Sequence, residues 1–247
     1  MFEATIIRAA MRHAEQEYPN ESCGVVTAQG YVPAMNIAGD PKTDFAIDEK
    51  WFDEQNALAV LHSHPDGNEY PSESDMRGQL STDIPWGIIP TRKFVRSEED
   101  FTIHASPPFF WGKGVPIPEL LQRGFRHGVT DCYELIRDWY KLERAITLPV
   151  YPREWGWWEN GGDLYNTLFA DAGFRRKKDH EDLAIGDVFL AQLNSSKLNH
   201  GGVYIGNGQV IHHPGETRRG YAPDRLSLRD PLISYKPFIR FWIRRES

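Results

Sequence analysis

The sequence predicts an α/β (α+β) protein made of two domains in tandem. Three observations carry this prediction. In the first half, an apolar run ends in His62-Ser63-His64 and is followed by a helical pattern. Residues 106–118 hold four prolines and two glycines. The second half opens with an amphipathic helix and continues with several short strands. The 247 residues suffice for one large domain or two small ones.

The first half alternates helices with strands. Apolar residues recur at helical spacing over residues 3–17, and Pro19 ends that helix. Ser72 followed by Glu73 and Asp75 is typical of an N-cap with acid in the first helical turn. The remaining pattern predicts a hairpin at 22–28 and 30–34, helices at 48–56 and 72–81, and strands at 57–62, 86–89 and 101–104.

The proline-rich segment predicts a domain boundary. Its density of prolines and glycines is incompatible with a helix or a central strand. We therefore expect a domain at residues 1–106, a linker at 107–118 and a second domain at 119–247. The aromatic residues of the linker are expected to dock onto one of the domains.

The second half predicts two helices and a set of strands. Leu135, Ile136 and Trp139 give the first helix an apolar face. Gly206-Asn207-Gly208 is a strong hairpin-turn signal. The pattern predicts helices at 131–144 and 162–172, and strands at 187–193, 201–205, 209–213 and 238–243.

Composition excludes several classes of protein. The net charge is −7 and no run of basic residues indicates a nucleic-acid surface. No apolar run approaches the length of a membrane span, and charged residues interrupt any N-terminal signal-peptide core. Cys23 and Cys132 are the two cysteines, which is too few for a disulfide framework. We therefore expect a protein that is made and folded in a cytoplasm.

The strongest candidate site is a metal centre. His62 and His64 project to the same side of a strand, because side chains alternate along it. With the carboxylate of Asp75 they fill three positions of a tetrahedral zinc and leave the fourth for water. Glu21 supplies a spare carboxylate, which a zinc-bound water needs as general base. The alternative is a polar loop in which Ser72 is only a helix N-cap.

These residues resemble the signature of the JAMM metallopeptidases, which have the MPN fold. That signature is a glutamate before a strand, then H-x-H, seven residues and S-x-x-D, and it is present here at the same spacing. The resemblance covers roughly residues 1–105. It implies a mixed-sheet domain in which His62, His64 and Asp75 bind Zn²⁺. It also implies that Glu21 activates the water and that Ser72 steadies the tetrahedral intermediate.

A second candidate site centres on Cys132, at the predicted start of a helix. The positive end of the helix dipole favours a thiolate there. His200, at a strand start, is the candidate base, since a cysteine nucleophile needs a histidine near it in space. A three-residue hairpin turn places His212 on the same face as His200, whereas a two-residue turn places His213 there. The alternative is a buried, inert Cys132.

These segments resemble the NlpC-type cysteine peptidases, a papain-like family that cleaves peptidoglycan stem peptides. The matching segments are Asp131-Cys132, Gly186-Asp187-Val188-Phe189, His200 with its G-x-Y-I-G strand, and Ile211-His212. Over roughly residues 120–245, the resemblance implies Cys132 as nucleophile, His200 as base and His212 as the third polar residue. The sequence departs from the family after the cysteine and in the tryptophan-rich insert 155–158, which puts the substrate pocket in doubt.

The order of the two modules resembles a family of tail-tip assembly proteins from lambda-like, long-tailed bacteriophages. This implies a tail-tip protein that processes a tail component, degrades peptidoglycan, or both. Its partners would be other tail-tip proteins and peptidoglycan peptides. It would act in the host cytoplasm during assembly or at the virion tail tip. Two alternatives are a JAMM processing enzyme for a ubiquitin-like or sulfur-carrier protein, and a non-catalytic tail-tip adaptor.

Overall fold

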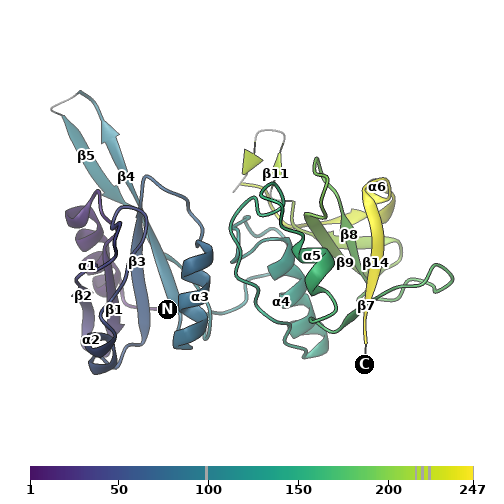
Figure 1. Ribbon diagram of the computed structural model, residues 1–247, viewed down its shortest axis with the longest axis horizontal. Helices are drawn as coiled ribbons and strands as arrows, with labels where there is room; N and C mark the ends of the chain where they lie inside the picture. Colours follow the sequence, from purple (N-terminus) through teal and green to yellow (C-terminus); the bar gives the residue numbers. More distant parts are fainter. Residues whose placement is uncertain (98–99, 215, 218–219, 222–223, 247) are drawn as a thin grey trace. The chain divides into compact units, whose positions relative to one another are not determined.

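The computed structural model describes residues 1–97, 100–214, 216–217, 220–221 and 224–246. The chain divides into two compact units, Met1–Pro116 and Ile117–Ser247. Each unit contains its own sheet and its own hydrophobic core (Figure 1). Among the described residues, no helix combines the length and apolar character needed to cross a bilayer.

The first unit is built on a mixed sheet with the strand order β2-β1-β3-β4-β5, in which β6 also pairs with β4. Strands β3 and β4 are parallel and the other pairs are antiparallel. Helix α3 (Glu73–Thr82) connects the parallel pair. The strands are β1 (Cys23–Thr27), β2 (Gly30–Ala34), β3 (Ala59–Pro65), β4 (Trp86–Val95), β5 (Phe101–Ala105) and β6 (Phe109–Trp111).

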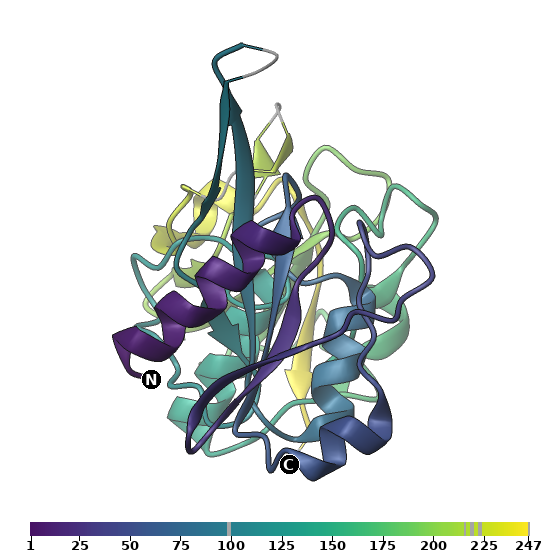
Figure 2. The same cartoon turned by 90° about the vertical axis from the view of Figure 1, so that its left-hand side faces the viewer.

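Helices cover both faces of this sheet. Helix α1 (Ala4–Glu17) crosses one face (Figure 2), where Ala10 and Ala14 pack with Leu61 in a buried core. Helix α3 lies against the other face, where Gly78 leaves room for Trp86: a Cβ would lie 2.4 Å from its ring. Because side chains alternate along β3, both histidines of the H-x-H motif point to the α3 face. A short helix, α2 (Glu49–Glu54), precedes β3.

The expected linker at 107–118 contributes a strand to the first unit. Strand β6 pairs with β4, with Trp111 opposite Trp86 and Phe109 opposite Ile88. It occupies the edge that β5 leaves free at the start of β4. The prolines lie before and after the strand, so no ladder N–H is lost. The connection between the units is therefore shorter than expected.

The second unit contains an antiparallel sheet with the order β13-β10-β9-β8-β14-β7, and a separate hairpin of β11 (Glu216–Thr217) and β12 (Gly220–Tyr221). The strands of the large sheet are β7 (Phe174–Arg176), β8 (Val188–Ala191), β9 (His200–Gly206), β10 (Gln209–His212), β13 (Leu228–Pro231) and β14 (Ile239–Arg245).

Hydrophobic clusters lie on both faces of this sheet. Helix α4 (Cys132–Arg144) buries Leu135, Ile136 and Trp139 against Val188 and Val203. Phe189, which points the other way from β8, belongs to the second cluster. Residues of α6 (Leu232–Tyr235) also belong to this second cluster. Helix α5 (Leu164–Leu168) packs against the first cluster.

The hairpin of β9 and β10 combines a two-residue turn with a bulge. Gly206 pairs with Gln209, so Asn207 and Gly208 form the turn, and both have positive φ (51° and 68°). The register then shifts and leaves Ile205 without a partner, which restores the pairing of Gly202 with His212. Of the two turns that the sequence left open, the two-residue turn is present, but the bulge gives the register that a three-residue turn would have produced.

We expect limited proteolysis to cut the chain first within residues 112–118. This segment follows the last paired strand of the first unit, and its residues are exposed except for half-buried Val115. Because each unit has its own core, both fragments should melt cooperatively after cleavage. Mass spectrometry of a tryptic digest, with Lys113 as an accessible site, and calorimetry of the fragments test this. Fragments that lose their cooperative transition would show that the units fold as one.

Candidate active sites

Four side chains of the first unit converge on the α3 face of the sheet. His62 Nε2 lies 3.1 Å from His64 Nε2 and 3.1 Å from Asp75 Oδ1. His64 Nε2 lies 3.4 Å from Asp75 Oδ2 and 3.9 Å from Glu21 Oε1. The structure therefore brings together the four residues selected from the sequence, which span 54 positions of the chain (75 − 21 = 54).

Strand pairing positions Glu21 and the histidines. Cys23 pairs with His62, so continuing the antiparallel register by two residues places Glu21 beside His64. Two hydrogen bonds hold this end of the ladder. The Ser63 N–H donates to the Ser22 carbonyl at 2.9 Å, and the Ser22 N–H donates to Ser63 Oγ at 2.8 Å.

Ser72 is the N-cap of α3 and forms a capping box with Asp75. Its Oγ accepts the Asp75 N–H at 3.0 Å, while its own N–H and hydroxyl donate to Asp75 Oδ2, both at 2.8 Å. The capping role considered from the sequence is thus present. It also orients the carboxylate, because Oδ2 is held by Ser72 while Oδ1 faces His62.

Burial governs the charges in this cluster. Burial raises the pKa of Glu21 to about 8, opposed by His64 and reinforced by Asp75. Burial also disfavours the Asp75 carboxylate, yet His62 and His64 hold its pKa well below the usual value. His62 is fully buried, with Phe45 stacked on its ring at a centroid distance of 4.4 Å.

The donor set fits a metal ion. The Asn68 carbonyl can only accept, so in the neutral ring the 2.9 Å hydrogen bond from His64 Nδ1 places the proton there and leaves a lone pair on Nε2. That lone pair faces His62 and Asp75. Ligand atoms of Glu21, His62 and His64 also lie within 4.8 Å of one another. Asp75 is nearer to both imidazoles than Glu21 is to His64, which favours Asp75 as the third ligand.

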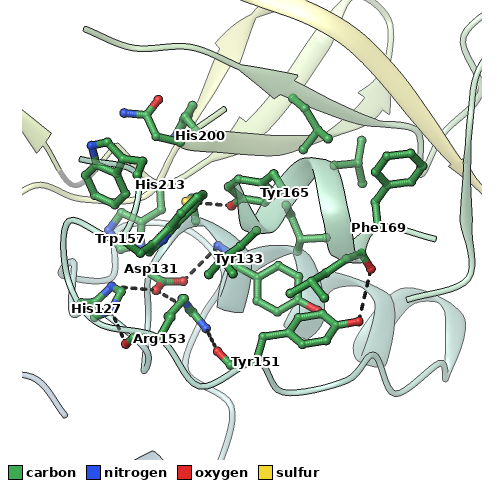
Figure 3. Close-up of a pocket in the computed structure, with 18 of the residues that line it drawn as sticks. His127, Asp131, Tyr133, Tyr151, Arg153, Trp157, Tyr165, Phe169, His200 and His213 are labelled. Carbon is green, nitrogen blue, oxygen red and sulfur yellow. Dashed lines mark hydrogen bonds and ion pairs between the residues drawn. The ribbon is translucent and has the colours of Figure 1, made fainter. Parts of the chain in front are cut away.

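The second cluster lies at the start of α4, in a cavity lined by aromatic rings (Figure 3). The Cys132 thiol lies 3.1 Å from the Tyr165 hydroxyl, and the Gly201 N–H donates to the sulfur. The thiol therefore contacts the segment that carries His200. The tryptophan-rich insert lines the same cavity. Its aromatic walls include Tyr133, Tyr151, Trp155, Trp157, Trp158 and Tyr165.

The thiol is not activated in this arrangement. Burial raises the pKa of Cys132 to about 11, and the neighbouring Asp131 carboxylate adds to the shift. Tyr165 and Arg153 oppose it only in part. Burial and the Asp131 carboxylate thus act against the thiolate that the helix start was expected to favour. Within the described residues, no hydrogen bond joins the Cys132 thiol to the His200 ring.

The structure pairs His200 with His212 and not with His213. His200 Nε2 lies 3.1 Å from His212 Nδ1, and His212 Nε2 lies 3.3 Å from Asp230 Oδ2. His213 follows the end of β10 and lines the same cavity as Cys132 and His200, but its Nε2 donates to the Arg225 carbonyl at 3.1 Å. Burial lowers the pKa of His200 and of His212, so both rings are neutral near pH 7.

Asp131 connects the helix start to a buried arginine. Its Oδ1 accepts the N–H groups of Tyr133 and Glu134, each at 3.0 Å, and caps α4. Its Oδ2 accepts the Gly128 N–H at 2.7 Å and Arg153 Nη2 at 2.5 Å. Although burial disfavours the charged carboxyl, Arg153 holds its pKa well below the usual range.

Sequence reasoning missed three residues of the second cluster. Tyr165, Arg153 and Asp230 lie 33, 21 and 98 positions after Cys132 in the chain (165 − 132, 153 − 132 and 230 − 132). None belongs to a motif of fixed spacing. The one available sequence signal was Asp230 itself, a polar residue in Arg229-Asp230-Pro231. Alternation along a strand does not identify such a residue as part of a site.

Comparison with known proteins supports the two-module organisation. A family model described as prokaryotic homologs of the JAB domain matches residues 3–101. The NlpC/P60 family model matches residues 107–227. The fold class predicted from the sequence, a JAB-like mixed-sheet domain followed by an NlpC-type domain, is therefore confirmed.

Two bacteriophage proteins resemble most of the chain. The tail tip assembly protein K of Escherichia phage lambda is 36% identical over 173 residues, covering 70% of this chain and 73% of that protein. Its counterpart from Escherichia phage N15 is 30% identical over 220 residues, covering 84% and 83%. The chain belongs to the tail tip assembly protein K family. The family expected from the order of the modules is thus confirmed.

Part of this K-family chain also resembles a bacterial peptidase. The CysO-cysteine peptidase of Mycobacterium tuberculosis (strain ATCC 25618 / H37Rv) is 25% identical over 114 residues. The match covers 40% of this chain and 77% of that protein. The K-family chain is accordingly a phage tail tip assembly protein with JAB-like and NlpC/P60 domains.

Replacing Asp131 by alanine should destabilise the second unit by about 3–5 kcal/mol, because Arg153 would stay buried without its carboxylate and α4 would lose its cap. The pKa of Asp131 is depressed in the folded state, so its contribution is present above roughly pH 4 and is lost as the pH falls further. Urea unfolding at about pH 7 and about pH 3 should show a smaller difference at the lower pH.

Asp171→Ala is the matched control for this measurement. Asp171 is exposed, so its replacement should change the free energy of unfolding by no more than about 0.5 kcal/mol. Equal stability of the Asp131→Ala variant and the wild type at neutral pH would contradict the role of the buried Asp131–Arg153 pair.

Proposed function

We propose that this tail tip assembly protein carries two peptidase modules, a zinc-dependent JAMM peptidase and a Cys/His peptidase that cleaves peptidoglycan peptides. One observation carries the proposal. Both imidazole Nε2 atoms of the H-x-H motif lie 3.1 to 3.4 Å from the Asp75 oxygens, with the Glu21 carboxylate beside them. The K-family relatives support a role in tail assembly, which would take place in the host cytoplasm or at the virion tail tip.

In the first module, His62, His64 and Asp75 would hold the zinc ion. When bound, zinc lowers the pKa of a water molecule and polarises a carbonyl oxygen. Glu21 is close enough to His64 to serve the same site, and as a base it would accept a proton on Oε1 and return it to the leaving amine. Ser72 keeps Asp75 oriented through the capping box and would steady the tetrahedral intermediate.

In the second module, Cys132 would attack the scissile carbonyl with His200 as its base. The pKa of about 11 keeps the thiol protonated at neutral pH, so transfer of its proton to His200 has to accompany attack. His212 would orient His200 through their hydrogen bond. The aromatic cavity around the thiol would receive the peptide, with other tail-tip proteins as assembly partners.

A second candidate function rests on the similarity to the CysO-cysteine peptidase. The JAMM module would then process a sulfur-carrier or ubiquitin-like protein in a cytoplasm. A third is a structural adaptor of the tail tip whose sites are inactive. Incubating the purified protein with intact peptidoglycan, neighbouring tail-tip proteins and a carrier protein separates these functions. Mass spectrometry would identify the bond that is cleaved. If none of the three substrates is cleaved, the structural adaptor is the function that remains.

We expect about one zinc ion per chain, bound in the first unit and removable by chelators. The double variant His62→Ala/Asp75→Ala should lose it, because two of the three proposed ligands are gone. Elemental analysis after dialysis measures the stoichiometry. His104→Ala is the matched control, since His104 is an exposed histidine of the same unit and should leave the zinc in place. Full zinc retention in the double variant would contradict the proposed ligands.

Glu21→Gln should retain the zinc and lose hydrolysis by the first module roughly a hundredfold or more, because the amide cannot accept the proton. Parallel measurements of zinc content and cleavage rate test this. Glu17→Gln serves as control, since Glu17 lies four residues away with a largely exposed side chain (47%). Loss of zinc from Glu21→Gln would identify Glu21 as a ligand and require another role for Asp75.

Cys132→Ser and His200→Ala should each stop cleavage of peptidoglycan peptides, whereas Cys23→Ser should not. His212→Ala should reduce the rate less, because His212 would act only through His200. His213→Ala should have the smallest effect of the three histidine variants, since the Nε2 of His213 is bound to the Arg225 carbonyl and not to the His200–His212 pair. Rates on purified stem peptides measure this order. Unchanged activity of Cys132→Ser would exclude a cysteine peptidase.

A further inference from the structure

We propose that Asp230 is a positioning residue that fixes the tautomers of His212 and, through it, of His200. The inference rests on the proposed cysteine-peptidase function of the second unit. Asp230 lies in β13, where it pairs with Val210 of β10, two residues before His212. From there its Oδ2 reaches His212 Nε2 at 3.3 Å. Asp230, His212 and His200 thus form one continuous chain of polar contacts.

The donors and acceptors of this chain have one consistent assignment. A carboxylate only accepts hydrogen bonds, so His212 must carry its proton on Nε2. Neutral His212 then has a lone pair on Nδ1, which must accept from His200 Nε2 at 3.1 Å. His200 consequently has a lone pair on Nδ1. Within the described residues no hydrogen bond engages that atom, which leaves it available as the base.

The argument requires both rings to be neutral, and their burial provides this. Desolvation lowers the pKa of His200, with His212 and His213 adding to the effect. Desolvation also lowers the pKa of His212, although Asp230 opposes the shift. A protonated ring would donate from both nitrogens and would impose no direction on the chain.

Tyr235 holds Asp230 and His212 in place. Its hydroxyl hydrogen-bonds to Asp230, and its ring lies edge-on to His212 at a centroid distance of 4.2 Å. Phe189 stacks on Tyr235 at a centroid distance of 5.9 Å. The Asp230 side chain itself is 32% exposed. Replacing it therefore removes a hydrogen-bond acceptor without opening a cavity in the core.

Imidazole NMR of the selectively labelled full-length protein tests this directly. In the wild type, both His200 and His212 should be single Nε2–H tautomers. In Asp230→Ala, His212 should become a mixture, because water can satisfy either nitrogen, and His200 should follow it. Asp230→Asn serves as a second variant of nearly equal size if the alanine variant does not fold. Its amide can donate to Nε2 and drive both rings toward Nδ1–H.

Kinetics provide the second readout. Cleavage of a purified stem peptide should lose kcat by about tenfold or more, up to ~10⁴-fold, with little change in KM, as expected when a base is held in the wrong tautomer. Arg229→Asn is the matched control, since Arg229 is the exposed neighbour on the same strand and should change neither spectrum nor rate.

The tautomer measurement decides the inference independently of activity. If Asp230→Ala and Asp230→Asn both keep single Nε2–H tautomers at His200 and His212, Asp230 does not position the pair. If the wild type cleaves no peptide but the tautomers change as expected, the proposed function fails and the positioning role stands. A tautomer change that leaves kcat intact would show that the pair is not the catalytic base.

Discussion

The pairing of Cys23 with His62 and of Gly202 with His212 is the constraint on which both candidate sites depend. Side chains alternate across a strand, so a slip of one residue in either ladder would turn the histidines to the opposite face. In the first unit, parallel pairing of β3 with β4 and the core under α1 fix the register. In the second, the bulge at Ile205 fixes the register, since the two-residue turn alone would have paired Gly202 with His213 instead of His212.

Burial then determines the chemistry of the groups that the register brings together. Desolvation raises the pKa of Glu21 and of Cys132, and lowers that of His200. Asp131 stays charged only because Arg153 and the amides of α4 surround it, and its charge works against a thiolate next to it. In this arrangement, burial and the charged cap of α4 act against the thiolate that the helix start favours.

The sequence predicted the first site more completely than the second. The residues of the proposed zinc site belong to short motifs of fixed spacing, and strand alternation and helix capping follow from local sequence. The turn and bulge at Ile205, the edge strand β6 and the strand β13 depend on tertiary pairing that no local pattern specifies. Tyr165 and Asp230 reach the second site only through such pairing and packing, so periodicity gave no sign of them. The helix at 162–172 is shorter than its pattern predicted, spanning Leu164–Leu168.

Both sites use the same physical device to direct a histidine nitrogen. In the first, the Asn68 carbonyl takes the Nδ1–H of His64 and leaves Nε2 to face the proposed metal. In the second, the Asp230 carboxylate takes the Nε2–H of His212 and, one ring further, leaves Nδ1 of His200 without a proton. In each site, the position of the proton on a neutral histidine ring is fixed because its partner can only accept a hydrogen bond. The acceptor is a backbone carbonyl in one case and a replaceable side chain in the other, so only the second device is open to a simple substitution.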